Sequence, residues 1–172
     1  MQKFLRSHWL TTENAERIRQ AVETGITGVT CMYVARWLQL PEWYWAVISA
    51  LIVRQGNPGD TFGASWTRIT GTAIGALVGG AFANLWGSEP WAFGIAVSAA
   101  VLACAALKLT ASYRLSSVTV AIVMLINHNN VSPWKIALHR FVEVALGIVV
   151  AVLLTLVFDW ISAKPASNIP AK

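Results

Sequence analysis

WYWAVISALIVRQGNPGDTFGASWTRITGTAIGALVGG, residues 43–80, combines a short apolar run, a polar break and the start of a long apolar run. The short run ends at Val53, and the break that follows, RQGNPGD, contains two glycines and a proline, which end a helix. Crossing a bilayer takes about 20 apolar residues, so the short run cannot cross it alone. The run from about Phe62 to Trp86 is long enough. The stretch therefore predicts a short broken helix followed by a full membrane span.

The chain as a whole is too apolar for a water-soluble domain of its size. Of its 172 residues, 56% are hydrophobic and 12% are charged, and its mean hydropathy is +0.56. Soluble domains are about 25% charged. We expect an all-α membrane protein with about six transmembrane helices over residues 21–162, a cytoplasmic amphipathic arm over 1–20 and a cytoplasmic tail over 163–172. The spans are predicted at 21–40, 43–53, 62–86, 90–109, 115–126 and 134–161.

The two halves of the sequence resemble each other at a spacing of 72 residues. Without a gap, this shift aligns Arg68 with Arg140 and Gly75 with Gly147. It also aligns the short second span with the short fifth span, each of which ends in a polar break. Three spans per half make the second half enter the membrane from the opposite side. We therefore predict two inverted three-helix repeats, over about 17–88 and 89–161, an arrangement typical of transporters.

The basic residues predict the orientation in the membrane. With the amino terminus inside, ten of the thirteen Lys and Arg residues fall on the cytoplasmic side, as expected where basic loops remain inside. The net charge of +5 therefore reflects topology, and we expect no nucleic-acid partner. The prediction is a multi-pass protein of the cell (inner or plasma) membrane, embedded in the lipid bilayer with both termini cytoplasmic.

Two arginines are the principal candidates for a binding site. Arg68 and Arg140 lie about two turns inside their predicted helices, where an arginine costs about 2.5 to 3.5 kcal/mol and normally faces protein or water. A guanidinium there can bind a carboxylate through two hydrogen bonds. The structural alternative is that Arg68 reaches out to the cytoplasmic headgroups and Arg140 pairs with Glu143 one turn away. The sequence leaves both readings open.

The polar breaks supply further candidates. Broken helices leave backbone groups unpaired within the membrane, which is where transport sites form. The candidate substrate-binding side chains in the breaks are Arg54, Gln55, Asn57, Asn127 and Asn129. Ordinary interfacial turns have the same composition, so this assignment also has a structural alternative. The candidate carriers of a coupling proton are the acids Glu23, Asp60 and Glu143.

Glycines recur every four residues in the third span, and the sixth span repeats the theme. The residues are Gly71, Gly75, Gly79 and Gly147. Small residues let helices approach closely, so we assign these glycines to helix packing. The sequence contains no phosphate-binding loop, no nucleophile elbow and no metal-ligand spacing of His or Cys. We therefore expect no enzymatic activity, no catalytic or metal site and no cofactor.

The opening stretch resembles the fusaric acid resistance and aromatic acid exporter families, whose pattern is a short aromatic-led helix, a polar break and an R-I-x-G-T-x-x-G helix. The residues that carry the resemblance are Trp45, Gln55, Arg68, Gly71, Thr72 and Gly75. The resemblance implies an integral membrane bound transporter domain that exports aromatic carboxylic acids. Family members often hold two six-span units and this sequence holds one, so the resemblance also implies a homo-oligomer, most simply a dimer.

The leading hypothesis is a gradient-driven exporter of small organic anions, in which Arg68 and Arg140 attract the carboxylate of the substrate. One alternative is a membrane scaffold subunit that transports nothing. Another is a channel that conducts without saturation. The sequence alone does not separate the three, because they differ in coupling and not in composition.

Overall fold

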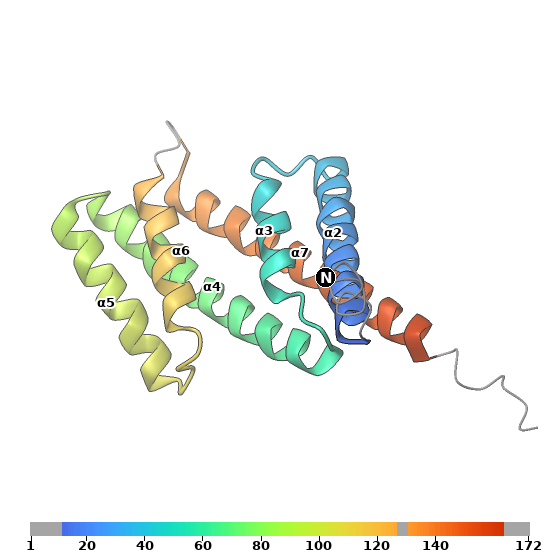
Figure 1. Cartoon of the computed structure of the whole chain (residues 1–172). Coiled ribbons are helices and arrows are strands. Elements are labelled where there is room, and N and C mark those ends of the chain that lie inside the picture. The colour runs from blue at the N-terminus through green and yellow to red at the C-terminus, as the bar shows by residue number, and fades with distance from the viewer. Residues whose placement is uncertain (1–11, 127–130, 164–172) are drawn as a thin grey trace, which may run out of the picture.

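The structure, a computed structural model of the chain, describes residues 12–126 and 131–163. Within these ranges every regular element is an α-helix. The helices in Figure 1 are α2 (Thr12–Trp37), α3 (Tyr44–Val53), α4 (Pro58–Trp86), α5 (Pro90–Ala106), α6 (Tyr113–Leu125) and α7 (Pro133–Ala163). The all-helical part of the predicted fold class is confirmed. Asn127 and Asn129 lie outside the described residues.

The break between α3 and α4 is shaped by a helix cap. The side-chain oxygen of Asn57 accepts a hydrogen bond from the backbone N–H of Asp60 at 2.9 Å, and the Asn57 amide donates to the Asp60 carboxylate at 2.6 Å. Pro58 occupies the first turn, where its missing N–H leaves no bond unmade. Asn57 and Asp60, predicted as a substrate ligand and a proton carrier, are both exposed and cap α4 in this structure.

The helices form two halves in which corresponding helices have corresponding neighbours. α4 packs against α5 and α6, α7 packs against α2 and α3, and the two long helices pack on each other. α2 lies beside α3 as α5 lies beside α6. Figure 1 shows that the chain reverses direction from each helix to the next, with α2 and α5 on opposite sides of the molecule. Each half therefore contributes its long helix to the packing of the other half.

Glycines allow the short helices to lie against the long ones. Those of α4 that face α6 are Gly71, Gly75 and Gly79, and Gly147 of α7 faces α3. A Cβ on Gly75 would overlap the carbonyl oxygen of Ser116 and lie 2.6 Å from the Cβ of Thr119. A Cβ on Gly147 would overlap the carbonyl oxygen of Ala46 and lie 2.9 Å from the Cβ of Ser49. Only glycine permits this backbone contact.

These contacts change the alignment of the two halves. Ala46 and Ser116 occupy the same place against their glycines, and so do Ser49 and Thr119; each pair is 70 residues apart. The glycines themselves are 72 apart. The ungapped spacing of 72 is therefore wrong for the short helices, where the correspondence needs a gap of two residues.

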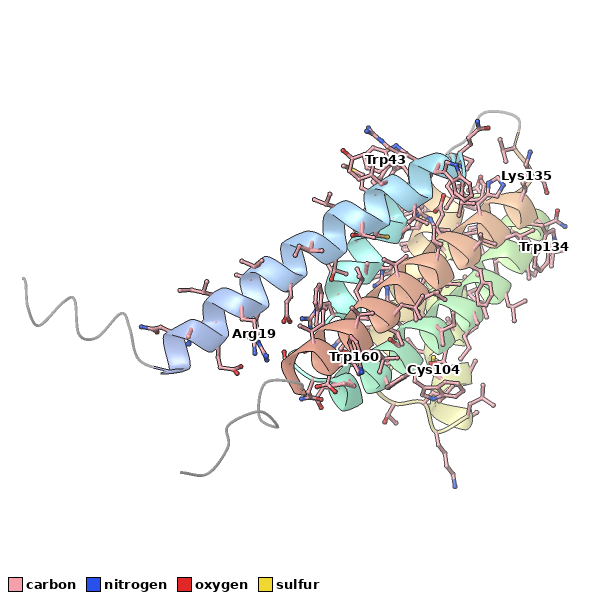
Figure 2. All side chains as sticks on the ribbon, turned by 90° about the vertical axis from the view of Figure 1, so that its right-hand side faces the viewer. Arg19, Trp43, Cys104, Trp134, Lys135 and Trp160 are labelled. Atoms are coloured by element: carbon pink, nitrogen blue, oxygen red, sulfur yellow. The ribbon has the colours of Figure 1, made fainter. Side chains whose placement is uncertain are left out.

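Two of the described helices, Pro58–Trp86 and Pro133–Ser162, are long and apolar enough to cross a membrane. α3, α5 and α6 are apolar but shorter, with 10, 17 and 13 residues. α2 runs through residue 20 without a break and carries most of its charges in its first half. Large apolar side chains are exposed on all six described helices. Figure 2 places Trp43 and Trp134 at one end of the molecule and Trp160 at the other, as in an interfacial belt.

Candidate anion-binding site

The two arginines that the sequence singled out both contact one face of α3. This face carries Trp45 and Ser49 and is called the α3 face below. The Nη2 of Arg68 on α4 donates a hydrogen bond to the Ser49 hydroxyl at 3.2 Å. The guanidinium of Arg140 on α7 lies over the Trp45 ring, 3.9 Å from its centroid. Trp45 and Ser49 are one helical turn apart, a rise of about 6 Å. The structure therefore brings together two arginines that lie 72 residues apart, close enough for their charges to repel each other.

Arg68 is a buried cation without a carboxylate partner among the described residues. It is 8% exposed, and its described polar contact is the Ser49 hydroxyl. The side chain therefore does not extend to the cytoplasmic headgroups in this structure, as the structural alternative would require. Burying a cation without a countercharge is unfavourable. An anion bound beside Arg68 would therefore compensate its charge.

Arg140 differs, because two acids lie against it. Its Nη2 is 2.8 Å from the Glu42 carboxylate, and its Nη1 is 3.6 Å from the Glu143 carboxylate. The backbone N–H of Glu42 also donates to Oε1 of Glu143 at 3.1 Å. The pairing of Arg140 with Glu143 considered from the sequence is thus present. Glu42 was missed because it precedes the short span, and its position after the Pro41 break was the available signal.

Several buried N–H groups on this face have no hydrogen-bond acceptor. They are Nε1 of Trp45, Nε of Arg68 and the three guanidinium nitrogens of Arg140. The carboxylate of Glu42 is in ionic contact with Arg140, but none of these nitrogens meets an acceptor in hydrogen-bond geometry. Buried donors are normally satisfied. All of these groups are donors, so the ligand that satisfies them is one that accepts, such as a carboxylate.

A hollow of about 210 Å³ adjoins Arg140 at one end of the molecule. Its lining residues are Pro41, Glu42, Val131, Lys135, Ile136, His139 and Arg140. Figure 2 shows Lys135 at the same end as Trp43 and Trp134. Arg140 therefore lies between this hollow and the α3 face.

The family model described as "Fusaric acid resistance protein-like" matches residues 30–154. The chain belongs to this family. The matched region contains the α3 face, both arginines and both acids that contact Arg140. The resemblance carried by Trp45 to Gly75 is confirmed.

This fusaric acid resistance-like chain is similar in sequence to three relatives from bacteria. The "Uncharacterized transporter YdhK" of Escherichia coli (strain K12) is 33% identical over 139 residues, which cover 76% of this chain and 21% of that protein. The protein of the same name in Salmonella typhimurium is 32% identical, over 76% of this chain and 20% of its own length. "UPF0421 protein YgaE" of Bacillus subtilis is 26% identical, over 79% and 38%. No solved structure matches the chain.

This fusaric acid resistance-like chain thus spans about a fifth of the length of its YdhK relatives. With relatives named as transporters and large apolar side chains exposed on all six described helices, it is a membrane protein.

A second charged cluster lies at the opposite end of the molecule. The Arg54 guanidinium forms an ion pair with Glu23 and donates to the backbone carbonyl of Gln55. Arg19 lies 3.6 Å from Glu23 and donates to the Ser162 hydroxyl at 2.7 Å. The space left in this cluster is only about 10 Å³. None of the described contacts of Arg54 or Gln55 joins them to the α3 face, so the structure separates the break residues from the two central arginines.

Proposed function

We propose that the chain is the membrane-spanning unit of a transporter that exports small organic anions, aromatic carboxylic acids in particular, driven by a gradient. The observation that carries this proposal is the set of buried donors without acceptors around Trp45, Arg68 and Arg140. The names of the relatives support transport. The direction and the aromatic class rest on family resemblance.

The proposal places a single carboxylate between the two guanidinium groups. Arg68 and Arg140 contact α3 one turn apart, and a charge-assisted N–H···O distance is about 2.8 Å. A carboxylate placed between them can therefore accept from both. Arg68 makes the larger contribution in this proposal, since Arg140 already faces two acids. The Trp45 indole supplies an apolar wall and one more donor for the ring-bearing end of the substrate.

The proposed membrane arrangement is six spans in two inverted repeats, with both termini cytoplasmic. The exchange of neighbours between the halves and the alternating chain direction in Figure 1 support it. Arg19 and Trp160 mark the end proposed to be cytoplasmic, and Lys135 marks the other (Figure 2). In this arrangement α3 and α6 are broken spans, in each of which a short helix and the polar loop after it cross the membrane together. Transporters whose sites lie near the bilayer midplane contain such broken helices. We keep a homodimer as the proposed assembly.

The scaffold alternative has one observation in its favour, the balance of Arg140 by two acids. Under that alternative the arginines only hold helices together. Under the channel alternative the same donors line a path without a saturable step.

Transport by inside-out vesicles separates the three functions. Vesicles carrying the chain are expected to accumulate radiolabelled benzoate with a rate that saturates. Arg68→Gln is expected to reduce the saturable rate at least about tenfold, because one charge-assisted hydrogen bond is worth about 1.5 to 3 kcal/mol. A rate that rises linearly with benzoate would indicate a channel. No uptake above empty vesicles, together with no benzoate binding to purified protein, would leave the scaffold.

A further inference from the structure

Two acids contact the same guanidinium beside the proposed substrate site. The binding of an anion does not by itself explain why acids lie there. Glu42 and Glu143 both contact Arg140, and the backbone N–H of Glu42 also bonds Glu143. The Glu143 side chain is 1% exposed and the Arg140 side chain 3%. Arg140, Glu42 and Glu143 are thus packed in a nearly closed space, and together they carry one more negative charge than positive.

Two acids already contact Arg140 before any ligand binds. Arg68 and Arg140 supply two positive charges, and Glu42 and Glu143 supply two negative charges. A carboxylate that binds Arg140 as well as Arg68 is a third negative charge around the Arg140 guanidinium, which is unfavourable in buried surroundings. A proton on one of the acids removes one of these negative charges. It also frees a nitrogen of Arg140 for the ligand.

The hollow provides a path for that proton. Glu42 lines it and its side chain is 16% exposed, so solvent can reach this carboxylate while Glu143 stays buried. Lys135, which also lines the hollow, marks that end of the molecule in Figure 2. Glu42 is therefore the acid of the pair that solvent reaches more easily.

We propose that the Glu42–Glu143 pair takes up one proton when a small organic carboxylate binds at Arg68 and Arg140. A proton from solvent adds to a carboxylate oxygen of Glu42, the ionic contact of Glu42 with Arg140 ends, and Nη2 of Arg140 donates to the ligand instead. Proton and anion then bind cooperatively, and each raises the affinity for the other by the same factor. This inference rests on the proposed anion site.

Other titratable and charged groups lie near the pair and could also make binding depend on pH. Arg68 on α4 and Tyr44 on α3 act electrostatically on Arg140, and Lys135 and His139 of α7 line the hollow. From α2, Arg36 stacks on Trp43, 4.4 Å from its ring centroid. Of these groups, only histidine ordinarily changes charge between about pH 5 and 8. Histidine must therefore be excluded as the source of any pH dependence.

The test is calorimetric titration of the full chain in detergent with benzoate between about pH 5.5 and 8, where a carboxylic acid of this class stays ionised. Buffers with different ionisation heats report the proton uptake. For the wild type, we expect Kd to rise up to about tenfold per pH unit and about one proton to be taken up per benzoate. Glu42→Gln mimics the protonated acid, so its Kd should be independent of pH and, at pH 8, at least as low as the wild-type Kd at about pH 5.5.

Two further variants make the outcome decisive. Glu143→Gln tests the other acid, and loss of the pH dependence in either Gln variant supports the pair. The control His139→Gln, which replaces the histidine that lines the hollow, should retain the wild-type slope. Benzoate binding without pH dependence in the wild type, a slope that persists in both Gln variants, or a slope lost in the histidine control would overturn the proton pair alone. No benzoate binding at any pH would overturn the anion site and the proton pair together.

Discussion

Arg68→Gln is expected to weaken benzoate binding roughly thirty- to hundredfold and to leave the ligand-free protein at least as stable as the wild type. The loss corresponds to about 2 to 3 kcal/mol, the upper part of the range for a hydrogen bond to a charged group. Stability is retained because the structure gives Arg68 no countercharge, so the substitution removes an unfavourable buried cation. Glutamine can still donate to Ser49. Calorimetric titration and thermal denaturation of the same preparations measure the two effects.

The matched control is Arg114→Gln, which removes an exposed arginine that contacts Tyr113 in the first turn of α6. It should change neither benzoate affinity nor stability. If Arg68→Gln instead lowers the melting temperature and leaves benzoate affinity unchanged, the residue serves packing and the binding role is wrong. The two readouts separate a site from a scaffold, which affinity alone does not.

Gly75→Ala is expected to destabilise the protein by about 3 kcal/mol, the upper part of the range for overpacking in a core. A Cβ at this position overlaps the backbone of Ser116 and meets Thr119, and backbone cannot rotate away as a side chain can. The helices α4 and α6 must move apart, which loosens the packing of Val120 and Val123 against α4. Thermal denaturation in detergent measures the change.

Gly63→Ala is the matched control, because it makes the same substitution in the same helix where no atom lies within 4 Å of the added Cβ. Alanine favours a helix over glycine by about 1 kcal/mol, so this variant should be as stable as wild type or more so. Equal stability of the two variants would mean that α4 and α6 are not in close contact at Gly75.

The helices were predictable where the sequence contains strong local signals. The break after Val53 contains Pro58 and an Asn cap, and the third span was expected at 62–86 and is observed as Pro58–Trp86. The fifth was expected at 115–126 and is observed as Tyr113–Leu125. Proline and glycine act on the few residues beside them, so these boundaries follow from local sequence. The observed lengths confirm that the second and fifth helices are short.

The site was predictable only in part. Arg68 and Arg140 stand out because a cation in an apolar run is costly. Their partners do not stand out, since Trp45, Ser49 and Glu42 meet them only through the packing of α3 between α4 and α7. The ungapped repeat aligned the two arginines with each other. In the structure both arginines contact α3, and two acids contact Arg140. This was not predictable because nothing in the alignment of the halves specifies which short helix each arginine contacts.

The measurement that tests the central claim most directly compares benzoate with benzamide, its neutral counterpart of nearly the same shape, in thermal denaturation of the wild-type protein. If the buried guanidinium groups at the α3 face hold a carboxylate, benzoate at 100 times its Kd should stabilise the folded protein by about 2.7 kcal/mol, and benzamide at the same concentration should not. Equal stabilisation by both compounds, or by neither, would contradict the account.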